Sequence, residues 1–343
     1  MKQVFLYLYS NSILMKKQIL IIVVAILNLS CVSIKAQDGK DGKPGASTDE
    51  STLTITKASI SEKMNYLASD ELEGRETGTP GIEKAAVYIE NFFSNNDVKP
   101  YFETYRDTFN LEKVVGYNIV GYVEGNDPKL RDEFIILGAH YDHIGNAKEV
   151  NGDVIANGAN DDASGTVAVM EWASYFAKSK TNKRSILFTL YSAEEMGLKG
   201  SAHLAKKLKD ENLNLYTMIN FEMIGVPRDE GRPYAYITGY NKSNIAEKLN
   251  EYNDSKMIGL FPRAKAFNLF MRSDNYPFYK EFKIPAHAIS TFDFENFKYY
   301  HHVDDEADQM DYDHMKHFIE QMIPAIEGMT NSENQDIKLI KNE

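Results

Sequence analysis

A short apolar run at Phe134-Ile135-Ile136-Leu137 is the feature that most restricts what this chain can fold into. The run is too short and too rich in β-branched residues for a helix, and it predicts a buried strand. His140 and Asp142 follow one residue apart, so in an extended backbone they point to the same side. The Asp142 carboxylate could then accept the second imidazole N–H and orient a metal-binding histidine. Taken alone, such a pair is about as consistent with a surface loop as with a metal site.

The rest of the chain alternates strand-like and helix-like patterns. Apolar runs predict further strands at residues 105–112, 115–123, 184–191 and 215–219. Helical spacing of apolar residues predicts helices at 57–68, 82–93 and 201–208, and another helix after Asp161-Asp162. This alternation is typical of an α/β fold in which helices flank a mostly parallel central sheet. We therefore expect one catalytic domain at residues 56–330.

The N-terminus carries the pattern of an export signal. Lys16-Lys17 precede the apolar segment 18–27, which is too short for a comfortable membrane span, so residues 1–36 are expected to be a signal peptide. Cleavage after Ala36 would give a periplasmic or secreted protein without a transmembrane span, whereas lipidation of Cys31 would give a lipid-anchored form. Residues 37–55 are expected to be a flexible linker and 331–343 a polar tail.

The composition limits the partners. A net charge of −12 argues against nucleic-acid binding and against broad adsorption to anionic membranes. Cys31 is the single cysteine of the chain, so no disulfide is expected after the leader is removed.

Acidic residues follow three of the apolar runs, and histidines follow later in the chain. The acids are Asp161, the pair Glu194-Glu195, and Glu222, and the histidines are His301-His302. Histidine and carboxylate ligands without cysteine suit zinc, with cobalt or manganese possible in its place. A bridging carboxylate would allow two metals about 3.5–4 Å apart, and one further carboxylate must stay off the metals to accept a proton. The adjacent Glu194 and Glu195 fit that division, one as base and one as ligand.

Each of these features also has a simpler interpretation. A Glu-Glu pair is usually solvated, Asp-Asp before a helix is usually a cap, and His301-His302 could lie on the surface. Their joint occurrence at the ends of apolar runs favours a metal site.

The local sequences resemble a known family. The chain is similar, over about residues 60 to 315, to the di-zinc metallopeptidases that include bacterial leucyl-type aminopeptidases, aminopeptidase Y and glutamate carboxypeptidase. The segments that carry this resemblance are LASDELEGRETGTPG, GAHYDHIG, NGANDDASG, YSAEEMGLKGS, INFEMIG, SDNYPF and YHHVDDEADQMD.

The resemblance implies a three-layer, phosphorylase/hydrolase-like α/β fold and two zinc ions. It implies His140, Asp161 and Glu222 on one zinc, and Asp161, Glu195 and His301 on the other, with Asp161 bridging. Glu194 would be the general base, and Asp142 would orient His140. Together with the expected export signal, these features predict an exported exopeptidase, in the first place an aminopeptidase acting on peptide substrates.

The chain departs from the family pattern at three positions. Glu222 stands where Asp is usual, Asn275 where His is usual, and His302 where Thr is common, so that His302 could replace His301 as the ligand. The turn at residues 71–76 is a family signature without a derivable role, expected to pack the N-terminal helices against the domain.

Three other functions remain open. A related single-zinc glutaminyl cyclase would need only Asp161, Glu195 and His301. A carboxypeptidase would need a cationic pocket, for which Arg263, Lys265 and Arg272 are candidates. An exported binding protein could keep the fold without catalysis. The aromatic loop at residues 292–299 either shapes a substrate pocket or simply packs. The sequence makes no prediction of the oligomeric state.

Overall fold

The computed structural model describes residues 53–340, so the predicted signal peptide and most of the predicted linker lie outside the described residues. Within residues 53–340, no helix is both long enough and apolar enough to cross a membrane.

A nine-stranded mixed sheet runs through the domain in the order β1-β3-β7-β4-β8-β11-β9-β10, with β2 also paired to β3. Its centre is parallel and consists of β7 (Ser185–Tyr191), β4 (Phe134–His140), β8 (Leu215–Glu222) and β11 (Ala286–Ser290). The antiparallel flank is formed by β1 (Lys99–Pro100), β2 (Arg106–Asn110) and β3 (Val115–Val123). At the other edge, β9 (Ala235–Ile237) is antiparallel to β11, and β10 (Ile258–Gly259) is parallel to β9. The predicted α/β fold is confirmed, and the parallel arrangement applies to the central strands.

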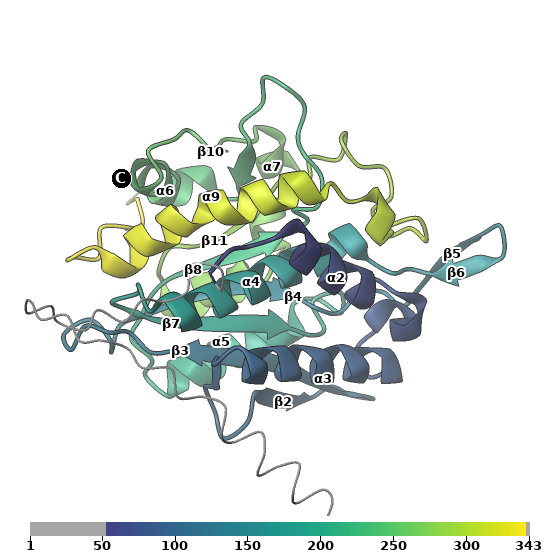
Figure 1. Ribbon diagram of the computed structural model, residues 1–343, viewed down its shortest axis with the longest axis horizontal. Helices are drawn as coiled ribbons and strands as arrows, with labels where there is room; N and C mark the ends of the chain where they lie inside the picture. The colour runs from purple at the N-terminus through teal and green to yellow at the C-terminus, as the bar shows by residue number, and fades with distance from the viewer. Residues whose placement is uncertain (1–52, 341–343) are drawn as a thin grey trace, which may run out of the picture. The chain divides into compact units, whose positions relative to one another are not determined.

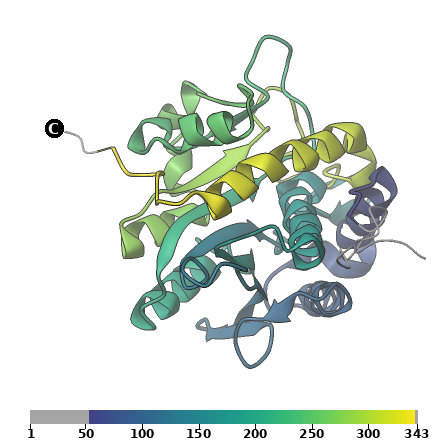
Figure 2. The ribbon, with the colours of Figure 1, turned by 60° about the vertical axis from the view of Figure 1, so that its left-hand side comes forward.

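Helices cover both faces of this sheet. One face carries α4 (Ser164–Ser179), with α3 (Pro80–Asn95), α2 (Lys57–Leu67) and α9 (Tyr312–Asn331) packed around it (Figure 1). The other face carries α5 (Lys199–Asp210) and α8 (Asn275–Phe282). Figure 2, in which the molecule is turned by 60°, shows α9 passing next to α4. The α6 helix (Ile245–Tyr252) packs against α9, and the short α7 (Arg263–Ala266) lies beyond it in the chain.

The two-residue alternation of β4 explains this three-layer arrangement. Ile135 and Leu137 join the hydrophobic core on the α4 side, whereas Ile136 joins the core on the α5 side. Successive side chains of a strand point to opposite faces, so an unbroken apolar run requires cover on both.

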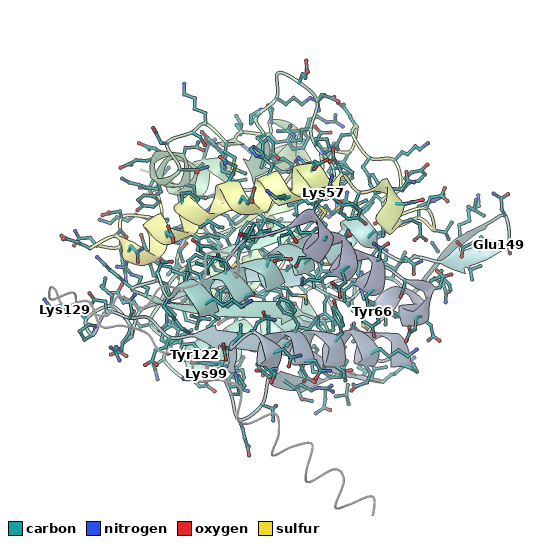
Figure 3. All side chains as sticks on the ribbon, in the orientation of Figure 1. Lys57, Tyr66, Lys99, Tyr122, Lys129 and Glu149 are labelled. Carbon is teal, nitrogen blue, oxygen red and sulfur yellow. The ribbon has the colours of Figure 1, made fainter. Side chains whose placement is uncertain are left out.

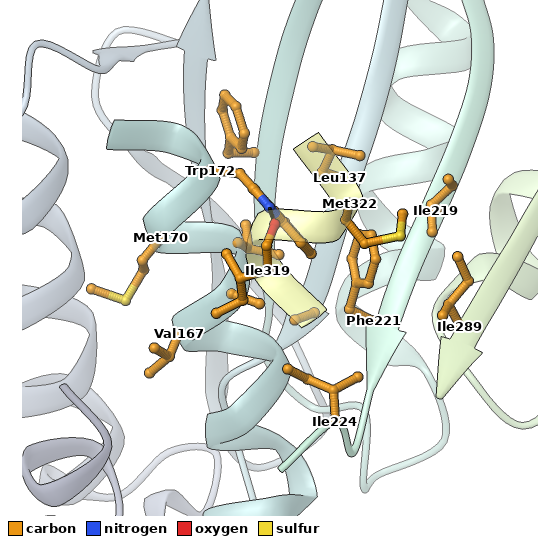
Figure 4. Packing of buried hydrophobic residues seen from close by; sticks show 14 of the residues in the cluster. Leu137, Val167, Met170, Trp172, Ile219, Phe221, Ile224, Ile289, Ile319 and Met322 are labelled. Atoms are coloured by element: carbon orange, nitrogen blue, oxygen red, sulfur yellow. Dashed lines mark hydrogen bonds between the residues drawn. The ribbon is translucent and has the colours of Figure 1, made fainter. Parts of the chain in front are cut away.

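The core on the α4 side is centred on Trp172. Its ring lies 4.3 Å from that of Phe221, and its indole N–H donates to the Ile319 carbonyl at 2.9 Å (Figure 4). Trp172 is fully buried, and complete burial of a large apolar side chain contributes about 1.5–3 kcal/mol to folding. The contact therefore joins helices α4 and α9 to strand β8 of the sheet.

Shorter elements connect this framework. A hairpin of β5 (Asn146–Val150) and β6 (Asp153–Ile155) extends from the loop after β4, with the exposed Glu149 near its tip (Figure 3). The remaining short elements are the helical turns η2 (Asp70–Arg75), η3 (Ala159–Ala163), η4 (Tyr240–Lys242), η5 (Leu269–Met271) and η6 (Ala307–Gln309).

Residues after α9 continue to contact the domain beyond the expected boundary at residue 330. Ile337 is buried, its N–H donates to the Tyr216 hydroxyl at 2.7 Å, and Leu339 forms a β-bridge with Ser243. The expected tail at residues 331–343 therefore packs through residue 340, because Ile337 anchors an otherwise polar segment.

Candidate metal centre and active site

The predicted site residues meet at the carboxyl ends of the central parallel strands. His140 ends β4, Glu222 ends β8, and Glu194 and Glu195 lie in the turn after β7. Asp161 lies in η3, at the start of the helix that follows β4. This edge is where open α/β sheets place their ligands, because the loops after parallel strands converge there.

The first ligand group consists of His140, Asp161 and Glu222. The Nε2 atom of His140 lies 3.2 Å from Oδ1 of Asp161 and 3.6 Å from Oε2 of Glu222. One donor atom from each of the three residues lies within 4.8 Å of the others, which leaves room for a single ion between them.

The second ligand group shares Asp161. Its other oxygen, Oδ2, lies 3.3 Å from Nε2 of His301, and that nitrogen is 3.1 Å from Oε1 of Glu195. Asp161 therefore presents one oxygen to each group, as a bridging carboxylate must. His302 lies outside this cluster, and its Nδ1 accepts the backbone N–H of Asp304 at 3.0 Å.

His143 also lies beside the second group, although it is not among the predicted site residues. Its Nδ1 lies 3.1 Å from Oε1 of Glu195 and 3.9 Å from Oδ2 of Asp161. An offset of three from His140 places His143 on the opposite side of an extended strand. The structure differs because β4 ends at His140 and the chain then turns. The signal in the sequence was the second histidine of GAHYDHIG.

Asp142 contacts both ligand-bearing segments. Its backbone carbonyl lies 3.0 Å from Nδ1 of His140, whereas its carboxylate lies 3.7 Å from that atom. The carboxylate instead accepts the backbone N–H groups of Glu194 at 3.2 Å and Glu195 at 3.4 Å. The main chain of Asp142 thus orients His140, and its side chain holds the Glu194-Glu195 turn.

Glu194 lines the pocket but belongs to neither ligand group. Burial raises the pKa of its carboxyl well above the usual value, and the negative charges of Glu222, Asp274 and Glu195 add to this against the opposing effect of His140. A carboxylate with a raised pKa, placed beside metal ligands, is suited to accept and return a proton.

The charge around His140 also favours cation binding. Burial lowers the pKa of His140, but the negative charge of Glu222 and hydrogen bonds with Asp142 and Asp161 outweigh it, so the pKa lies well above its usual value. A site that stabilises positive charge this strongly at a buried imidazole is suited to a metal cation.

The turn at residues 71–76 has a clear structural role. Arg75 is buried, and its guanidinium donates to the carbonyls of Tyr141, Asn157 and Gly158, and to that of Leu67. Tyr141 lies in the loop that carries His140, and Gly158 directly precedes η3. The same turn therefore links the two metal-binding loops to each other and to α2.

Asp305 supports the bridging ligand. Its carboxylate accepts the backbone N–H of Asn160 at 2.7 Å and that of Asp161 at 3.1 Å. This fixes the backbone of Asp161, and the YHHVDDEADQMD segment that carried the resemblance contains both Asp305 and the ligand His301.

A pocket of about 80 Å³ opens beside both groups. Leu269, Phe292, Phe294 and Tyr300 form its apolar wall, so part of the aromatic loop at 292–299 does line it. Among the described residues that line this pocket, Arg272 is the cationic side chain.

The remaining candidate positions lie elsewhere. Arg263 pairs with Glu295, and Lys265 lines a separate surface pocket. Asn275 is buried, and its amide donates to the carbonyls of Phe270 and Ala286 at 3.2 Å each.

Comparisons with known proteins identify relatives. Residues 118–326 match the model of peptidase family M28. A probable zinc metalloprotease of Pyrenophora tritici-repentis is 39% identical over 113 residues, covering 33% of this chain and 25% of the relative. A probable leucine aminopeptidase of Arthroderma otae is 28% identical over 207 residues, covering 58% of this chain and 53% of the relative. The chain thus spans about half or less of the length of these curated relatives.

Solved structures share the fold. The LapA aminopeptidase of Legionella pneumophila superposes with a TM-score of 0.64 at 22% identity, covering 88% of this chain and 79% of LapA. The glutaminyl cyclase of Bacteroides thetaiotaomicron gives 0.61 at 17% identity, covering 82% of this chain and 99% of the cyclase. Because the family match extends over more than half of the sequence, this chain belongs to peptidase family M28.

Proposed function

We propose that this protein is an exported, zinc-dependent aminopeptidase that hydrolyses N-terminal residues from peptides. The observation that carries the proposal is the position of Glu194 beside two ligand groups that share Asp161 within one pocket. Its relatives include a probable zinc metalloprotease and a probable leucine aminopeptidase, which supports this reaction class.

The donor atoms fit two zinc ions. The groups offer imidazole nitrogens and carboxylate oxygens, which zinc binds well and which cobalt or manganese could also use. When bound, such ions lower the pKa of a water molecule and polarise the scissile carbonyl. We assign His140, Asp161 and Glu222 to one ion, and Asp161, Glu195 and His301 to the other.

The side chains around these groups would perform the proton transfers. Glu194 would accept a proton from the attacking water and return it to the leaving amine. Glu194 belongs to neither ligand group, so its carboxylate is free for both transfers. Asp142 would hold Glu194 in place through the backbone hydrogen bond at 3.2 Å.

The pocket favours a substrate with a free amine and an apolar side chain. Asp161, Glu194, Glu195 and Glu222 line it, against the one guanidinium of Arg272. With two zinc ions bound, the charges of Asp161, Glu195 and Glu222 would be neutralised, and Glu194 would be the carboxylate of this lining left free to pair with an N-terminal ammonium group. Phe292, Phe294 and Leu269 offer apolar contacts for the side chain of the first residue.

Export is proposed from the N-terminal sequence. Cleavage after Ala36 would leave a free periplasmic or secreted protein, and modification of Cys31 would leave a lipid-anchored one. Intact-mass measurement of the protein purified from its native cells distinguishes these two products.

One peptide in three forms tests the activity: with a free N-terminus, with an acetylated N-terminus, and with N-terminal glutamine. We expect release of the first residue from the free form, no release from the acetylated form, and loss of activity with a chelator. Restoration by zinc would link the activity to the metal groups.

Other results would select other functions. Ring closure of the glutamine peptide without cleavage would indicate a glutaminyl cyclase, the function named for one protein of similar fold. Release of the C-terminal residue from the acetylated peptide would indicate a carboxypeptidase, and inactivity of zinc-loaded protein on all three peptides would favour a binding protein. A C-terminally blocked peptide checks the carboxypeptidase assignment, because a carboxypeptidase needs the free carboxylate and would not cleave the blocked form.

A further inference from the structure

His143 is buried beside the second ligand group without a hydrogen-bond partner for its ring. Its side chain is fully buried, and neither ring nitrogen forms a hydrogen bond with any residue in the described part of the chain. A buried polar group left unpaired costs about 1–3 kcal/mol, so the ring requires another partner.

The ring is held in place by the surrounding backbone. Its own backbone N–H donates to the Arg75 carbonyl at 3.2 Å. Gly158 packs against it so closely that an added Cβ would lie 2.5 Å from Cγ of His143. Gly158 also has φ +59, which favours glycine, and its carbonyl accepts from Arg75. The loop geometry therefore orients this imidazole.

The position of the His143 ring fits metal binding better than hydrogen bonding. Nδ1 lies 3.1 Å from Oε1 of Glu195, yet the geometry at the nitrogen does not fit a hydrogen bond between these atoms. An imidazole nitrogen of His143 and one carboxylate oxygen each of Glu195 and Asp161 lie within 4.8 Å of one another, so a single ion fits between the three residues.

Three of the four distances between the imidazole nitrogens and the carboxylate oxygens are close to those around one tetrahedral ion. Bonds of about 2.0–2.2 Å from zinc place neighbouring ligand atoms about 3.3 Å apart. His143 and His301 lie 3.1 Å from Oε1 of Glu195, and they lie 3.9 and 3.3 Å from Oδ2 of Asp161. Their rings meet edge to face with centroids 5.6 Å apart, so both can approach one point.

We propose that His143 is a fourth protein ligand of the second metal, completing the set His143, Asp161, Glu195 and His301. This inference rests on the proposed metallopeptidase function. The two sites are then unequal, because the first group supplies three protein ligands and keeps an open position. Closed four-ligand sites are typical of structural zinc, and sites with an open position are typical of catalytic zinc.

Two consequences follow for metal loading. The closed site fills first and binds more tightly, and the first group, next to Glu194, fills second and offers the position for water and substrate. His140 and His143 thus bind different metals, although His140 ends β4 and His143 lies only three residues later.

Metal titration of the His143→Gln variant tests the proposal. The mature protein and the variant are each titrated with zinc against a chromophoric chelator, and zinc content is measured by elemental analysis. We expect the affinity of the tighter site to fall by more than the roughly 10–100-fold that follows loss of a merely supporting partner. His302→Gln is the matched control, because His302 lies next to His301 in the chain but outside both ligand groups. The zinc affinity of this variant should stay unchanged.

Cobalt gives a second readout that does not depend on activity. One equivalent of cobalt should give wild-type protein and His302→Gln the intense visible absorption of a four-coordinate ion, and His143→Gln a weaker band of altered shape. An unchanged spectrum, or an affinity loss of no more than about 100-fold, in His143→Gln would overturn the proposal. The fluorescence of Trp172 in metal-free protein checks that the variant is folded.

The proposed function can fail separately. If wild-type protein binds two metals but cleaves no peptide, the aminopeptidase assignment is wrong while the ligand assignment is still tested by the titration. If wild-type protein cleaves peptides and His143→Gln keeps wild-type affinity and spectrum, only the ligand assignment is wrong.

Discussion

Arg75 donates through Nε to the backbone carbonyl of Tyr141 at 2.8 Å, which places a buried cation directly behind the loop that carries His140. The same guanidinium reaches Asn157 at 2.6 Å and Gly158 at 2.9 Å, in the loop that leads to Asp161. Burial lowers the pKa of Arg75 to about 10, partly offset by the nearby carboxylates of Asp305 and Asp142. Arg75 is therefore charged at neutral pH and binds both loops through their carbonyls.

Replacing Arg75 with lysine should loosen both metal groups. A lysine ammonium cannot match the planar arrangement of four acceptors, so buried carbonyls would lose their partner. We expect a loss of about 3 kcal/mol in the free energy of unfolding and weaker binding of both metals. Urea unfolding followed by Trp172 fluorescence measures the first, and chelator competition the second. Arg131→Lys, at an exposed pair with Glu124, should change stability by less than about 0.5 kcal/mol.

Replacing Glu194 with glutamine should remove turnover and leave the metals in place. The amide keeps the shape of the side chain but cannot accept the proton, and Glu194 belongs to neither ligand group. We expect kcat to fall by roughly 100- to 10,000-fold with unchanged zinc content. Glu195→Gln should lose zinc as well as activity. Turnover near the wild-type level in Glu194→Gln would rule out the general-base role.

Shortening Glu222 to the aspartate usual in this family should weaken the first metal group. Oε2 of Glu222 already lies 3.6 Å from Nε2 of His140, and removal of one methylene would withdraw the carboxylate by about 1.5 Å. The Asn220 amide, which donates to Oε1 at 3.2 Å, would lose its acceptor as well. We expect the weaker-binding equivalent of zinc to bind about tenfold less tightly, as measured by competition titration. Equal or tighter zinc binding by Glu222→Asp would show that an aspartate at this position also reaches the first metal group.

Acidification should destabilise the fold partly through His287. The ring is buried and neutral, with Nδ1 2.8 Å from the Thr238 carbonyl and Nε2 2.7 Å from the Ser243 hydroxyl. Burial lowers its pKa to about 4, below the value of about 6.5 in an unfolded chain. The unfolded state therefore binds the proton first, so this stability is complete above pH about 6.5 and declines as the pH falls towards about 4.

Unfolding of metal-free protein at several pH values measures that decline. The contribution of His287 is about 3 kcal/mol across the window, and His287→Gln should flatten the slope of unfolding free energy against pH between about 4 and 6.5. His317→Gln, at an exposed position, should keep the wild-type slope. An unchanged slope in His287→Gln would mean that other groups account for the acid sensitivity.

The sequence predicted the parts of the fold in which apolar periodicity is strong. The strand expected at residues 115–123 coincides with β3, and the helix expected at 57–68 differs from α2 by one residue. These segments carry their own pattern, since each buries a regular set of side chains. In contrast, β9, β10 and the hairpin of β5 and β6 are two to five residues long, too short for a periodic signal.

The positions of the site residues could be predicted where a residue ends a strand. They could not be predicted where the residue lies in a turn. His140 and Glu222 end strands, so their position followed from the strand pattern. His143 and the true hydrogen-bond partners of Asp142 depend on the turn after β4, and Arg75 reaches the site from more than 60 residues upstream. Sequence spacing does not determine contacts of that kind, because they arise only when separate loops pack together.

The six donor residues extend in the chain from His140 to His301. Arg75 holds the segments that carry His140 and Asp161 together through hydrogen bonds to their carbonyls. The donor residues and Arg75 come from separate segments of the chain, so metal uptake is coupled to the packing of these segments against one another. A truncated or misfolded product would bind zinc poorly and stay inactive. Metal content thus reports whether a molecule has completed its assembly.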